Sequence, residues 1–190
     1  MTANRRRPSF LSLRLLAHVI ARRRKDGNRQ QKRRQVVQEI LGRYHQHKSL
    51  AGVAIDSSGE GYTLLPGADW GYDQTTLGRF TKETGVEISD LHPPPASTAK
   101  PSAQTNHHAT WLKWRAGQIR NFHGRLAREI RNSVPEGKLY VATTAMQTNS
   151  DLGSLMRPSL PARVGVEELL LAIGIAPENY ANQKDGIVLL

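Results

Sequence analysis

Three short apolar runs, separated by amphipathic stretches, constrain the fold of this chain most strongly. The runs cover residues 50–55, 138–143 and 186–190, and their length is that of buried strands. Between them, apolar residues recur at three- and four-residue spacing, as on the inner face of a helix. This alternation is typical of α/β proteins with a parallel sheet. We therefore predict an α/β fold with about three parallel strands and covering helices.

The stretches between the runs predict the helices and one long loop. Asp73 and Gly85 have the character of an N-cap and a C-cap at the two ends of one helix. Residues 91–109 contain four prolines and no apolar periodicity, which predicts a surface loop inside the domain. The helices are predicted at residues 35–44, 73–85, 111–130 and 166–173.

The charge of the chain is concentrated at its beginning. Residues 1–34 hold 12 of the 27 Lys and Arg residues and one of the 16 acidic residues, so they carry the whole net charge of +11. Phe10, Leu13, Leu16 and Ile20 have helical spacing within this segment. We predict a basic extension over residues 1–34, helical or disordered, before a neutral domain at 35–190. Such a segment suits nucleic acid or an anionic surface, and the alternative is a merely solvated extension.

Several classes of protein are excluded. The chain has no cysteine, which excludes disulfides, thiolate metal sites and a cysteine nucleophile. The apolar stretch Phe10–Ala21 is shorter than the ~20 residues of a membrane span, and Arg14 and His18 interrupt it. It runs into Arg22–Lys25 without a small-residue cleavage site, so we predict neither a transmembrane segment nor a signal peptide. The compartment, cytoplasmic or exported, stays open.

Four blocks of sequence, in a fixed order, carry a resemblance to a known family. They are Val36–Ile40 leading to Leu50–Ile55, Gly61–Asp73 leading to Phe80–Gly85, Trp111–Arg115, and Lys138–Ala142. Over about residues 33–145 the chain resembles the glycosyl-hydrolase-like ten family of α/β-barrel proteins. The resemblance implies a fragment of a (β/α)8 barrel, because these blocks form the middle of the barrel in that family. The apolar last run, residues 186–190, fits a fold that is cut rather than finished.

The resemblance also implies chemistry on O-glycosyl bonds, which requires two carboxylates beside the scissile bond. Asp56 directly follows an apolar run, where α/β barrels place their functional groups, and Glu60 lies in the same loop. These two are the predicted catalytic residues, and a polysaccharide or oligosaccharide is the predicted ligand. Aromatic and acidic residues of the loop that suit sugar binding are Tyr62, Trp70, Tyr72 and Asp73.

Each candidate has a simpler structural role open to it. Asp56 and Asp73 are suited to capping, and Trp70 and Tyr72 to packing of the loop. Trp111, Trp114 and Arg115 are expected to pack the long helix on the sheet and leave the arginine exposed.

No catalytic carboxylate can be named after the predicted strand at residues 138–143, where a barrel enzyme would place one. Residues 143–147, after the second apolar run, contain no acid, so we expect the isolated chain to be weakly active or inactive. No cofactor is predicted, and no metal site, because the pairs His45/His47 and His107/His108 lack a third ligand at suitable spacing. The alternatives are nucleic-acid or anionic-surface binding through residues 1–34, and no independent function.

Overall fold

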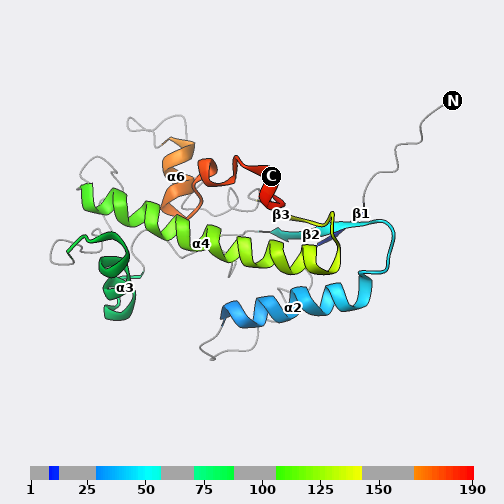
Figure 1. Ribbon diagram of the computed structural model, residues 1–190. Coiled ribbons are helices and arrows are strands. Elements are labelled where there is room, and N and C mark those ends of the chain that lie inside the picture. The colour runs from blue at the N-terminus through cyan, green and yellow to red at the C-terminus, as the bar shows by residue number, and fades with distance from the viewer. Residues whose placement is uncertain (1–8, 13–28, 57–70, 88–105, 143–164) are drawn as a thin grey trace.

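The computed structural model describes residues 9–12, 29–56, 71–87, 106–142 and 165–190 (Figure 1). They confirm the predicted α/β class, with helices between the three predicted strands. The elements, in chain order, are β1 (Ser9–Ser12), α2 (Arg29–Tyr44), β2 (Leu50–Asp56), α3 (Gln74–Thr84), α4 (Asn106–Ser133), β3 (Lys138–Ala142), α6 (Val166–Ala172), the 3-10 turns η4 (Pro177–Tyr180) and η5 (Gln183–Asp185), and β4 (Ile187–Leu189).

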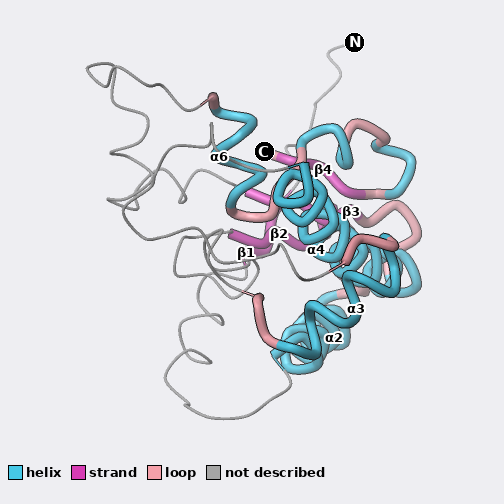
Figure 2. Tube along the Cα trace, turned by 90° about the vertical axis from the view of Figure 1, so that its left-hand side faces the viewer, coloured by secondary structure: helices cyan, strands magenta, loops and turns pink. Residues whose placement is uncertain are grey.

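The four strands form one parallel sheet whose spatial order is the order of the chain, β1-β2-β3-β4 (Figure 2). In the register of the sheet, Val53 lies beside Leu139, which lies beside Ile187. Each connection therefore places the next strand beside the previous one, and always moves across the sheet in the same direction.

The two faces of the sheet differ in burial. Val53, Leu139 and Val141 are fully buried and belong to the main core, together with residues of α2 and α4. On the opposite face, Ala54 and Tyr140 are only half-buried. Successive side chains of a strand point to opposite faces, so this alternation assigns one face of the sheet to the helices.

Among the helices, α4 contributes the most side chains to this core. Ile119, Phe122, Leu126 and Ile130 recur at three- and four-residue spacing and are all buried. The same spacing in α2 buries Val37, Ile40 and Leu41, and α2 packs beside the second half of α4 (Figure 1). The predicted stripe of the long helix is confirmed.

Helix α3 docks on the first half of α4 through a second, smaller cluster. Phe80 and Trp111 are fully buried there, with Leu77 and Leu112 beside them. Asp73 is the N-cap of α3, and Gly85 is its C-cap with φ +73° and an N–H that donates to the Thr81 carbonyl at 2.8 Å. Both predicted ends of this helix are confirmed.

The beginning of the chain differs from the prediction where it is described. Ser9–Ser12 form a strand that pairs with β2, although the spacing of Phe10 and Leu13 predicts a helix. Pairing with an adjacent strand outweighs a local periodicity this short, because strand preference depends strongly on context. Helix α2 begins at Arg29, so a boundary between residues 34 and 35 falls within it. Residues 1–8 and 13–28 lie outside the described residues, and so does most of the predicted basic extension.

Two further findings refine the predicted elements. Helix α4 begins at Asn106, so the last four residues of the predicted loop 91–109 are helical, and residues 88–105 lie outside the described part. Within the described ranges, no helix combines the length and the apolar character needed to cross a bilayer.

Candidate functional site

Because all the strands are parallel, the carboxyl ends of β2, β3 and β4 lie together at one end of the sheet. This end is called the carboxyl edge, and the end where the strands begin is the opposite edge. Asp56 is the last residue of β2 and is in register with Ala142, the last residue of β3. At the end of β4, the Leu190 N–H donates to the Val141 carbonyl at 2.8 Å. The prediction that Asp56 stands at the carboxyl end of a strand is confirmed for its backbone, and its side chain lies outside the description.

Of the other predicted site residues, three fall in a segment that the structure does not describe. Glu60, Tyr62 and Trp70 belong to residues 57–70, which connect the end of β2 to the start of α3. Their catalytic and substrate-binding roles stay predictions.

Asp73 is engaged in capping α3. The Thr76 N–H donates to Asp73 Oδ1 at 3.0 Å, and the Thr76 hydroxyl donates to Oδ2 at 2.6 Å. These hydrogen bonds hold the pKa of the Asp73 carboxyl below its ordinary value, because they stabilise the ionised form. The structure thus gives Asp73 the simpler of its two roles, and substrate binding by the exposed carboxylate stays a prediction.

Tyr72 is half-buried against the first turns of α4. Its ring centroid is 5.3 Å from that of Trp111, and its hydroxyl lies 3.5 Å from His108 Nδ1. The short stretch at residues 71–73, just before α3, is therefore anchored to α4 by an aromatic contact. This is the packing role that the sequence left open for Tyr72, and its role in sugar binding is still a prediction.

Two polar residues on the inner face of α4 escaped the sequence analysis. Arg115, expected to be exposed, is 2% exposed, and His108 is 7% exposed. Burial, followed by the charge of Arg115, lowers the pKa of His108, so its imidazole is held neutral. Their spacing could have predicted this burial, because positions 108 and 115 lie three and four residues from the buried Trp111 and so share its face of the helix.

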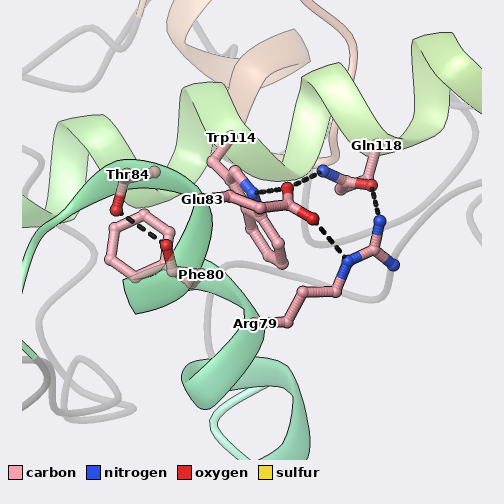
Figure 3. A network of polar contacts seen from close by, with 6 residues as sticks. All are labelled: Arg79, Phe80, Glu83, Thr84, Trp114 and Gln118. Carbon is pink, nitrogen blue, oxygen red and sulfur yellow. Dashed lines mark hydrogen bonds and ion pairs between the residues drawn. The ribbon is translucent and has the colours of Figure 1, made fainter.

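A polar network joins α3 to α4 (Figure 3). Glu83 accepts hydrogen bonds from Arg79 Nε at 2.7 Å, Trp114 Nε1 at 2.7 Å and Gln118 Nε2 at 2.8 Å. These donors, Arg79 first, lower the pKa of Glu83. A carboxylate so fully engaged is a poor general base, so the network serves docking of the helices.

The remaining buried polar pair has a structural role. His123 is fully buried, and its Nδ1 lies 2.9 Å from the Tyr180 hydroxyl. Burial raises the pKa of Tyr180, so the phenol stays protonated and fastens η4 to α4. Among the described residues, no three His, Asp or Glu side chains gather to hold a metal ion.

Searches against models of protein families, curated proteins and solved structures found no match to this chain. The resemblance to the glycosyl-hydrolase-like ten family therefore rests on the sequence blocks alone and stays a prediction.

Proposed function

We propose that this chain is a saccharide-binding relative of the α/β-barrel glycoside hydrolases and that it binds its ligand at the carboxyl edge of its sheet. One observation carries the proposal: the parallel strands follow one another in chain order, and Asp56 ends an inner strand of that sheet.

The strand order favours barrel-type winding over the other common α/β arrangement. In a doubly wound sheet the strand order reverses at a switch point, and helices cover both faces. A (β/α)8 barrel keeps its strands in chain order, with the helices outside. The described strands show no reversal, and one face packs on α2 and α4. The four strands in the described part of the chain would correspond to half of such a barrel.

The same topology supports the carboxyl ends of the strands as the ligand site. In parallel α/β sheets, functional groups gather at the carboxyl ends of the strands. Residues 57–70 start from this edge at Asp56, and their sequence supplies Glu60, Tyr62 and Trp70. Carboxylates can bind sugar hydroxyls, and aromatic rings offer an apolar face for a sugar ring.

Binding without efficient hydrolysis fits the residues at this edge. Hydrolysis requires a second carboxylate across the bond. The described end of β3 is Ala142, that of β4 is Leu189, and residues 143–147 contain no acid. Asp56 is then a ligand-binding carboxylate, and turnover of the bound saccharide is weak or absent.

The test is an oligosaccharide array followed by calorimetric titration of the full chain with the best ligand. Asp56→Asn should weaken binding by about 10- to 100-fold, the loss of a charged hydrogen bond. Glu136→Gln is the matched control, because Glu136 is exposed and precedes β3 at the opposite edge of the sheet. Binding to no saccharide, or equal affinity of Asp56→Asn and the wild type, would overturn the proposal.

A further inference from the structure

A groove of about 580 Å³ runs along the outward side of α4, and five of its ten lining residues are arginines. Its remaining side chains are polar, apart from one glycine, and the only carboxylate among them is Asp185. The five arginines are Arg79, Arg120, Arg125, Arg128 and Arg131.

We propose that this groove binds the phosphodiester backbone of a nucleic acid. The proposal is independent of the saccharide site, which lies at the carboxyl edge of the sheet, and of the predicted basic extension at residues 1–34.

The helix arranges the charges in a row. Positions 120, 124, 128 and 131 lie within about 80° of one another around the helix axis, at 3.6 residues per turn. With a rise of ~1.5 Å per residue, Arg120 and Arg131 are separated by ~17 Å along the axis. Gly124 stands between two arginines and leaves the floor of the groove open. A Cβ at this position would lie 3.3 Å from a terminal nitrogen of Arg120.

Three of the guanidinium groups are held in place by their neighbours. Arg120 donates to the Asn179 carbonyl at 2.8 Å and to Asp185 at 2.5 Å, and only 15% of its side chain is exposed. Arg131 donates to the Lys184 carbonyl at 3.2 Å, and Arg79 donates to Gln118 Oε1 at 2.8 Å. Groups already ordered before binding lose less conformational entropy when a ligand arrives.

Arg128 adds a further positive charge to this row. Arg128 is exposed, and within the described part of the chain it has no ion pair. It stands three residues from Arg131, a spacing at which like charges repel. The neighbouring Glu129 does not offset this repulsion between Arg128 and Arg131, because its carboxylate binds Arg34 and Gln38 of α2. A bound anion would offset the repulsion.

The lining selects among anionic ligands. A guanidinium group fits phosphate oxygens with two parallel hydrogen bonds. No aromatic or aliphatic side chain lines the groove, so it suits neither sugar stacking nor a small apolar ligand. One strand of duplex DNA carries a charge every ~3.4 Å of axis, so ~17 Å of groove would face about five phosphates. Arg120, Arg128 and Arg131 lie along this length, and Arg125 and Arg79 lie beside it.

The test measures binding of the full chain to a labelled DNA duplex of about 20 base pairs, as a function of salt. Each lost phosphate contact lowers the slope of log K against log salt by ~0.9. The double variant Arg125→Glu/Arg128→Glu should therefore lose about two units of slope and at least ~10-fold in affinity. Lys82→Glu/Lys113→Glu is the matched control, because both lysines are exposed, neither lines the groove, and the charge change is identical.

Residues 1–34 are unchanged in both double variants, so any binding by them cancels in the comparison. The proposal predicts a loss confined to the groove variant, with an unchanged thermal melt. Equal losses in the two variants, or an unchanged slope in the groove variant, would overturn it. Competition by hyaluronate as strong, charge for charge, as that by unlabelled DNA would overturn the assignment to phosphodiesters.

Discussion

At the scale of single residues, Gly52 shows how closely the inner strands approach each other. It has φ +152° and is in register with Lys138 on the neighbouring strand. A Cβ built at this position would lie 1.9 Å from the Lys138 carbonyl oxygen, far inside van der Waals contact. The obstacle is backbone, which cannot rotate away, so only glycine fits the pairing of β2 with β3.

We therefore expect Gly52→Ala to destabilise the fold by about 3 kcal/mol or more, measured by chemical denaturation. The control is Gly78→Ala in α3, where an added Cβ meets nothing within 4 Å. There the substitution should stabilise the protein by ~0.5–1 kcal/mol, because alanine is the better helix former. Similar stability of the two variants would mean that β2 and β3 do not pair in this register.

The cap at Asp73 predicts a dependence of stability on pH. Its pKa is lower in the folded chain than the ordinary 3.8, so the unfolded chain binds the proton first as the pH falls. The stabilisation is thus complete above about pH 4 to 5 and is lost as the pH drops through the folded pKa. Asp73→Ala should lower the melting temperature by about 2–4 °C at pH 7. In melts below about pH 3 the difference should narrow, and a difference that grows there would contradict the capping role.

At the scale of the elements, the attachment of α3 depends on one aromatic cluster. The Phe80 ring lies 5.1 Å from Trp111 and 5.5 Å from Trp114, and the two indoles stack 5.2 Å apart. The polar network around Glu83 is joined to this cluster through Trp114, whose Nε1 donates to Glu83 (Figure 3). Docking of α3 therefore combines buried aromatic area with a few directed hydrogen bonds.

Truncation of the cluster should release α3 before it unfolds the sheet. Phe80→Ala should cost ~3–5 kcal/mol, and amide hydrogen exchange should accelerate most in α3. Phe80→Leu keeps most of the apolar volume and is expected to cost clearly less. Uniform loss of protection over α3 and β2 alike would show that α3 is not a separately docked element.

The elements also show which parts of this fold can be predicted from sequence. Caps and apolar stripes are local signals, so they predict both ends of α3 and the buried stripe of α4. The start of α4 lies five residues before the first residue of the predicted helix. Strand β1 could not be predicted in this way, because its four residues fit a helical spacing equally well. Only their pairing with β2 determines that they form a strand. The position of Asp56 at a strand end was a local prediction too. The arginine groove was not predictable, because it requires Arg120 to meet Asp185, 65 positions away in the chain.

At the scale of the whole molecule, the sheet combines parallel strands in chain order with one face committed to helices. This arrangement separates two surfaces. The carboxyl edge holds Asp56, and the outward side of α4 holds the arginines. The proposed saccharide site and the proposed nucleic-acid groove therefore lie on different parts of the molecule. Substitutions in one should leave binding at the other unchanged.

Binding of a saccharide at the carboxyl edge can be measured by amide NMR spectra recorded during an oligosaccharide titration. We expect shifts concentrated at Asp56, Ala142 and Leu190 and lost in Asp56→Asn, with little change at Lys138 and Ile187 at the opposite end of the strands. Shifts confined to that opposite edge or to α4, or no shifts with any oligosaccharide, would contradict this expectation.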